Sequence, residues 1–143
     1  MQWAKALEVP VGLNPGKGIA EAELVQVLDR LLLQADVKRD DFGLIASFEF
    51  QGQKMRLDVC ADGSNFIALS NAWALPEDIM PSEVLPRINR LNRRLRWVKI
   101  QWMPTDDSIL VAIEFIASGA AELGAVLGSY LKALYAAARI AMA

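Results

Sequence analysis

The chain has 143 residues, of which 54% are apolar and 22% charged, and its formal net charge is −2. This length fits one ordinary domain, and the negative charge gives no overall electrostatic case for binding nucleic acid. The chain has no histidine and a single cysteine, which excludes the commonest general base, an internal disulfide and cysteine-based metal sites.

Residues 1–18 contain two prolines and three glycines, which predicts an irregular arm ahead of a single α+β domain over 19–143. Lys5 and Glu8 interrupt the apolar residues of this arm, so it does not read as a secretion signal. No stretch has the apolar length of a membrane span, and we expect a cytoplasmic protein that binds no membrane.

The first half of the domain changes from helical to alternating periodicity. Leucines and a valine recur at helical spacing between positions 24 and 32 and predict a helix over 20–35. A charged connection over 36–41 follows. Alternation of apolar and polar residues then predicts three strands, at 42–50, 54–60 and 66–71. Tight polar turns between these strands favour an antiparallel meander.

The second half opens with a loop to Met80 and a helix over 81–96, for which Ser82 is a natural N-cap. Pro86 is tolerable there only in the first helical turn, where backbone donors lack partners anyway. The buried stripe of this helix is expected to consist of apolar residues one turn apart, namely Leu85, Ile88, Leu91 and Leu95.

Two more alternating runs predict strands at 98–103 and 109–116, and a long helix begins near Ala120. The element order is therefore α-β-β-β-α-β-β-α. This order indicates the α+β class, with a twisted antiparallel five-stranded sheet and helices packed on it.

Arginines cluster on the central helix. Helical geometry places Arg87, Arg90 and Arg94 on one face, with Arg93 and Arg96 on another. One interpretation is an anion site. The favoured interpretation is a solvated helix face whose arginine heads pair with Asp or Glu.

No residue pattern here indicates catalysis. Adjacent carboxylates such as Asp106 and Asp107 fall in predicted turns, where turn chemistry explains them. Cys60 has no histidine or other obvious base beside it, and we expect it to be an unreactive small residue. We therefore predict no catalytic, cofactor or metal site.

The last helix carries the strongest signal for an interaction. Gly124 and Gly128 are four residues apart, which suits close helix packing, and tight contacts are expected to offset their helical cost. The apolar stripe that includes Leu127, Leu131 and Tyr135 is wider than one partner element needs. These three residues are candidates for an interaction surface.

The run Ile88-Asn89-Arg90-Leu91-Asn92, followed by Trp97 and a strand, resembles the signature of the YbjN-like family of bacterial sensory transduction regulators. The resemblance covers about residues 20–140. Asn89 and Asn92 match its motif, to which no catalytic role is attached. Their expected role is to tie the helix to a neighbouring backbone. The resemblance implies a fold like that of the class I type III secretion chaperones, which are small, usually dimeric proteins that hold a client segment.

The leading hypothesis is a non-enzymatic protein-binding or regulatory module that forms a homodimer and needs no cofactor. One alternative is a secretion-type chaperone that holds a client segment. A second alternative is a small-molecule or anion-binding domain whose site combines Trp73 with Arg87, Arg90 and Arg94. Nucleic acid is not an expected partner.

Overall fold

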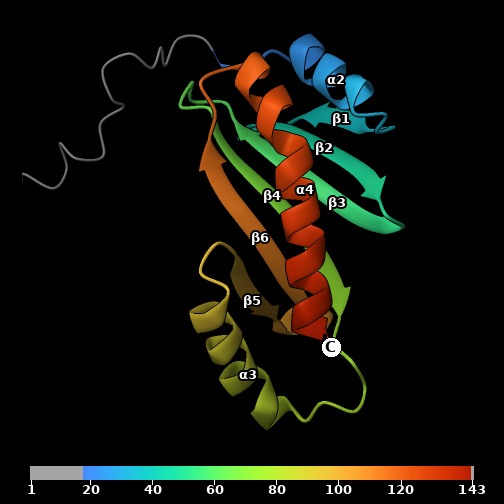
Figure 1. Cartoon of the computed structure of the whole chain (residues 1–143), viewed down its shortest axis with the longest axis vertical. Helices are drawn as coiled ribbons and strands as arrows, with labels where there is room; N and C mark the ends of the chain where they lie inside the picture. The colour runs from blue at the N-terminus through green and yellow to red at the C-terminus, as the bar shows by residue number, and fades with distance from the viewer. Residues whose placement is uncertain (1–17, 143) are drawn as a thin grey trace, which may run out of the picture.

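The computed structural model describes residues 18–142 as a six-stranded antiparallel sheet with three α-helices on one of its faces (Figure 1). The helices are α2 (Glu21–Arg30), α3 (Pro81–Arg94) and α4 (Ala120–Met142). The strands are β1 (Asp36–Arg39), β2 (Gly43–Phe50), β3 (Gln53–Cys60), β4 (Phe66–Ala74), β5 (Lys99–Met103) and β6 (Ser108–Ile116). A short 3-10 helix, η1 (Pro104–Asp106), links β5 to β6. The predicted arm lies almost wholly outside the described residues.

The strand order in the sheet is β1-β2-β3-β4-β6-β5. The predicted α+β class and the antiparallel meander are confirmed, but the prediction of five strands is wrong. The additional strand is β1, in the stretch taken for a charged connection. Charged residues dominate it because it is an edge strand, where charge protects an unpaired edge from other chains.

The core lies between the sheet and the helices. Alternate residues of each strand point toward the helices, so Leu57, Leu69 and Val111 are fully buried. Leu127 and Leu131 of α4 pack into the same apolar cluster. Burial of each leucine from water stabilises the fold by about 1.5–3 kcal/mol.

Helix α2 ends at Arg30, five residues earlier than predicted. The N–H of Leu33 donates to Leu28 O and the N–H of Leu32 donates to Asp29 O, both at 3.0 Å. These two bonds form a Schellman motif, which requires a left-handed residue and usually uses glycine there. Leu32 occupies that position with φ 59°, and its side chain is 91% exposed.

Helix α3 also departs from the prediction at its start. The N-cap is Met80 rather than Ser82, with Pro81 as the first helical residue. Pro86 therefore lies in the second turn, where its missing N–H leaves one helical hydrogen bond unmade. The inward-facing residue of this turn is Val84, and Leu85 is 53% exposed rather than buried.

Asn65, in the β3–β4 turn, holds three parts of the chain together. Its Oδ1 accepts a hydrogen bond from the N–H of Ile19 ahead of α2. Its backbone carbonyl accepts one from the N–H of Ala117, just after β6. Asn65 is 4% exposed and has φ 55°, a conformation that asparagine tolerates better than most residues. The start of α2, the β3–β4 turn and the end of β6 are thus fixed at one end of the molecule.

Candidate interaction surfaces

No helix in residues 18–142 covers the second face of the sheet, here called the open face (Figure 1). Strand register sets its composition. Arg56 of β3 lies beside Ser70 of β4, Ser70 beside Ala112 of β6, and Ala112 beside Lys99 of β5. Charged residues therefore occupy the flanks, and small residues occupy the centre.

The centre of the open face, here called the central strip, runs along β4 and β6 and is mainly apolar. Its members on the outward side of these two strands are Phe66, Ala68, Ser70, Ala72, Leu110, Ala112 and Ile116, and the charged Glu114 lies among them opposite Ala68. Phe66 and Ile116 form a register pair at one end, with 37% and 53% of their surfaces exposed. An apolar strip with a charged border is the usual anatomy of a protein interface.

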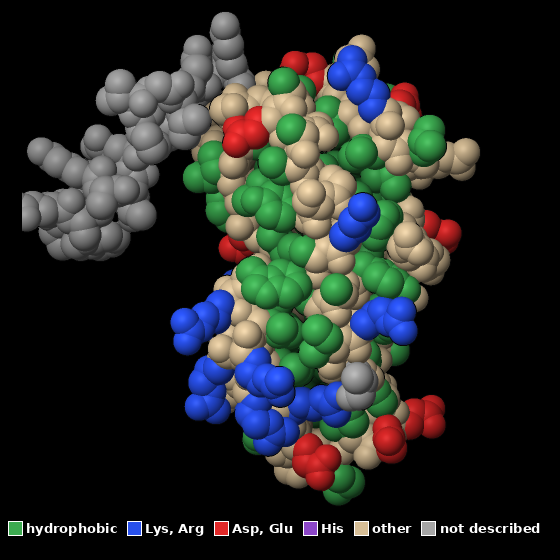
Figure 2. All heavy atoms as spheres, viewed as in Figure 1, with side chains coloured by type: hydrophobic (Ala, Val, Ile, Leu, Met, Phe, Trp, Pro, Cys, Tyr) green, Lys and Arg blue, Asp and Glu red, His purple; other side chains and the backbone are tan. Residues whose placement is uncertain are grey.

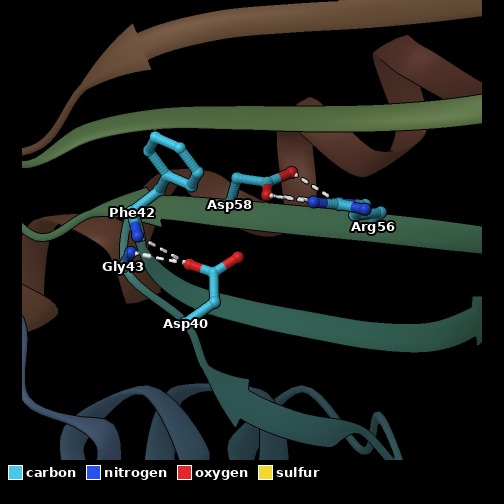
Figure 3. Close-up of polar contacts among 5 residues, drawn as sticks. All are labelled: Asp40, Phe42, Gly43, Arg56 and Asp58. Carbon is cyan, nitrogen blue, oxygen red and sulfur yellow. Dashed lines mark hydrogen bonds and ion pairs between the residues drawn. The ribbon is translucent and has the colours of Figure 1, made fainter.

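One ion pair borders the central strip, and a second joins its other side to a carboxylate within it. On β3, Arg56 binds the carboxylate of Asp58 through two nitrogens, with Nε–Oδ2 and Nη2–Oδ1 distances of 2.9 and 2.8 Å (Figure 3). The hydrogen bond to Asp58 raises the pKa of Arg56. On the other side, Lys99 of β5 lies 3.8 Å from Glu114, which belongs to β6 between Ala112 and Ile116. A depression of about 650 Å³ lies toward the Ala72–Leu110 end of the strip, where Arg56 and polar residues of β2 and β3 also line it.

A tight turn shapes the edge of this face between β1 and β2. Asp40 Oδ1 accepts hydrogen bonds from the N–H groups of Phe42 and Gly43, at 2.8 and 3.0 Å (Figure 3). Gly43 has φ 148°, and a Cβ there would lie 1.9 Å from the carbonyl oxygen of Val59. Only glycine fits at this point. Phe42 is left at the tip of the turn with 84% of its surface exposed.

A motif asparagine ties helix α3 to the edge strand β5. Asn92 donates from Nδ2 to Ile100 O at 3.0 Å, and its Oδ1 accepts from Ile100 N at 2.8 Å. The side-chain amide thus pairs with the strand as a neighbouring peptide group would. Asn89 is exposed, and its side chain makes no hydrogen bond within residues 18–142. The expected tie to a neighbouring backbone is therefore observed for Asn92 alone.

The arginines of α3 and a fifth arginine two residues after its end form a cluster that we call the arginine face: Arg87, Arg90, Arg93, Arg94 and Arg96. Figure 2 shows lysine and arginine side chains gathered over this part of the molecule. Arg87 Nη2 donates to Ala141 O at 3.1 Å and so joins α3 to the end of α4. The predicted pairing of the other arginines with acidic residues is not observed within residues 18–142, where three other cations do form such pairs.

Several residues predicted for an interaction surface lie elsewhere. Leu127 and Leu131 are at most 1% exposed, so that part of the prediction is corrected: their stripe is the core contact of α4 with the sheet. Tyr135 is half-buried and meets the ring of Phe50 edge-on at 6.2 Å. The hypothesis of a small-molecule or anion site requires Trp73 to lie beside the arginines of α3. Trp73 is half-buried in β4 and does not line the depression of about 320 Å³ beside Arg87 and Arg90.

The glycines of α4 face α2, as their spacing suggested, but the packing there is not tight. A Cβ on Gly124 would lie 3.9 Å from Val27 Cγ2, and one on Gly128 would lie 3.8 Å from Leu31 Cδ2. These are ordinary van der Waals distances. Both glycines line a groove of about 560 Å³ between α2, α4 and the β2–β3 turn, and the exposed Leu32 stands at its side.

The titratable groups of the described residues do not form a catalytic arrangement. Burial, together with the carboxylates of Asp62 and Asp58, raises the pKa of the Cys60 thiol, which makes it a poor nucleophile at neutral pH. Hydrogen bonds from Ser64 and Ser118 lower the pKa values of Asp62 and Glu122. Within residues 18–142, no group of three or more acidic or cysteine side chains is arranged to hold a metal ion.

Sequence reasoning did not identify the central strip. The alternation Phe66, Ala68, Ser70, Ala72 on β4 was a usable signal, because small residues on the outward side of a central strand leave a flat surface. Its neighbour across the sheet, β6, is more than 30 residues away in the chain, so only the sheet order brings the two halves together.

No helix in the part of the chain that the structure describes is both long enough and apolar enough to cross a bilayer.

Comparison with known proteins gives one family match and two informative structures. The sequence profile of the YbjN family, described as "Putative bacterial sensory transduction regulator", matches residues 21–133. An uncharacterized protein from Methanothermobacter thermautotrophicus has a similar crystal structure, with a TM-score of 0.66 and 15% identity over 85% of this chain and 93% of that one. The HopA1–SchA chaperone–effector complex contains a chain with a TM-score of 0.53 and 12% identity, over 81% of this chain and 90% of that one. None of the curated proteins matches the sequence significantly.

Proposed function

Because the chain belongs to the YbjN family, we propose that it is a non-enzymatic regulatory or chaperone-like module that holds a segment of a partner polypeptide on the open face. The observation that carries this proposal is the central strip. It combines exposed apolar side chains, a depression and two ion pairs on a sheet face that no helix of residues 18–142 covers.

A polypeptide segment suits this surface for physical reasons. The middle of the strip consists of the small residues Ala68, Ser70, Ala72 and Ala112, so a chain can approach the sheet closely there. The ion pairs Arg56–Asp58 and Lys99–Glu114 carry charges of both signs and can pair with polar groups of a bound segment. The likeness of the fold to a chain of a chaperone–effector complex supports a protein partner.

We expect the protein to act in the cytoplasm as a homodimer. Light scattering after size-exclusion chromatography measures the molar mass in solution and so shows directly whether a dimer forms. If the Ala72→Glu substitution converts a dimer into a monomer, a second copy occupies the central strip and the proposal of a partner segment is overturned.

The proposal is tested by affinity capture. The experiment compares the proteins that wild type and two variants bind in lysates of cells that encode the protein. Ala72→Glu places a charge in the central strip, and Ala136→Glu places the same charge on an exposed position of α4 as a matched control. We expect quantitative mass spectrometry to show a partner that Ala72→Glu loses at least tenfold and that Ala136→Glu retains. An identical set of proteins with wild type and Ala72→Glu contradicts the proposal.

A further inference from the structure

The arginine face concentrates positive charge on a protein whose net charge is −2. Within residues 18–142, no carboxylate comes within 4.0 Å of Arg90, Arg93, Arg94 or Arg96. Outside the cluster, Lys38, Arg56 and Lys99 have an acidic partner within that distance, whereas the five other cations of residues 18–142 have none. The arginine face differs from the rest of the surface in gathering four such cations on one helix and the two residues after it.

Part of the cluster has a role within the fold. Arg87 joins α3 to α4 through Ala141 O, and Arg93 Nε donates to Asn89 O at 3.4 Å. Arg93 and Arg94 also lie in the last helical turn, where positive charge favours the helix dipole. Arg90 lies further from the helix end and has no such explanation. Arg90 and Arg94 stand one turn apart, and like charges at that spacing destabilise a helix by about 0.2–0.5 kcal/mol.

We propose that the arginine face binds an acidic segment of the partner polypeptide, with Arg90 and Arg94 pairing with its carboxylates. This inference rests on the proposed function, which supplies a polypeptide partner. Residues at i and i+4 of a helix are about 5–6 Å apart at Cβ. Alternate residues of an extended chain are about 7 Å apart, so two acidic residues separated by one position match the two guanidinium groups.

The chemistry favours a carboxylate partner over nucleic acid. A guanidinium fork binds a carboxylate through two parallel hydrogen bonds, so two or three arginines suffice for a short acidic segment. Affinity for nucleic acid grows with the number of phosphates neutralised, and the remaining surface of this acidic protein opposes that accumulation.

The experiment titrates the full chain with a fluorescein-labelled octa-glutamate peptide in 50 mM salt and follows fluorescence anisotropy. We expect Arg90→Ala/Arg94→Ala to weaken binding at least tenfold. Arg90→Lys/Arg94→Lys keeps the charge but loses the fork, and it should weaken binding about threefold. Arg30→Ala/Lys132→Ala removes two exposed positive charges from other helices and should change the affinity less than twofold.

Two results overturn the inference: no binding of the peptide by wild type, or equal losses in the arginine-face variant and the Arg30/Lys132 control. Tighter binding of an eight-nucleotide single-stranded DNA than of the peptide assigns the surface to nucleic acid instead. Ala72→Glu should bind octa-glutamate as wild type does. The capture experiment therefore tests the role of the central strip, and the peptide titration independently tests the role of the arginine face.

Discussion

Replacement of Asn92 by alanine tests the tie between α3 and β5. The substitution removes both hydrogen bonds to Ile100 and leaves that residue's N–H and C=O without a protein partner at the edge of the sheet. A typical hydrogen bond contributes about 0.5–1.5 kcal/mol, so the loss is about 2 kcal/mol. Alanine returns about 0.5 kcal/mol because it is the better helix former. The expected net loss is about 1.5 kcal/mol, or about 5 °C in Tm for a chain of this size.

Urea denaturation and amide hydrogen exchange measure this effect, with Asn89→Ala as the control. Asn89 is exposed and its side chain makes no hydrogen bond within the described residues, so its replacement should be neutral or stabilising by about 0.5 kcal/mol. Exchange at the Ile100 amide should accelerate in Asn92→Ala alone. Equal stabilities of the two variants, or an unchanged Ile100 amide, would refute the reasoning.

Three further substitutions test other features of the fold. Gly43→Ala places a methyl group against Val59 O and should destabilise the protein by more than about 3 kcal/mol, which a strongly lowered urea midpoint would show; a wild-type midpoint contradicts the turn geometry. Gly128→Ala should raise the free energy of unfolding by about 1 kcal/mol, because its Cβ has room beside Leu31; a loss of stability means that α2 and α4 pack more tightly. Glu122 has a lowered pKa in the folded state, so its contribution is present above the ordinary glutamate pKa and disappears as pH falls through the folded value. The Tm difference between wild type and Glu122→Gln should therefore be largest near neutral pH and vanish in acid, and a constant difference contradicts the role of the charge.

Most elements could be predicted because their apolar periodicity is regular. The exceptions have physical causes. Strand β1 has a single apolar residue, Val37, because the charges of an edge strand replace the alternating pattern. The end of α2 was missed because Leu31, Leu32 and Leu33 continue the apolar run through the turn, and the left-handed position carries leucine where glycine is the usual signal.

The candidate surfaces were less predictable than the fold. An apolar helical stripe such as that of Leu127 and Leu131 can belong to an interface or to the core. Only the placement of α4 on the sheet shows that these are core residues. The arginine face was visible in the sequence, but the absence of neighbouring carboxylates from its described surroundings depends on how α3 sits on β5. The role of Asn92 could be expected as a tie, whereas its partner Ile100 required the register of the edge strand.

The anchor at Asn65 gives the molecule two distinguishable ends. Residue 18 leaves the fold beside the β3–β4 turn, and α3 lies at the opposite end, next to the last turn of α4 (Figure 1). A fluorophore attached at residue 18 itself is therefore remote from the arginines. One joined after α4 stands beside Arg87 and competes for the space in front of them. Immobilisation through the first end leaves the arginine face accessible, and a sensor chip prepared through the other end would underreport binding at α3.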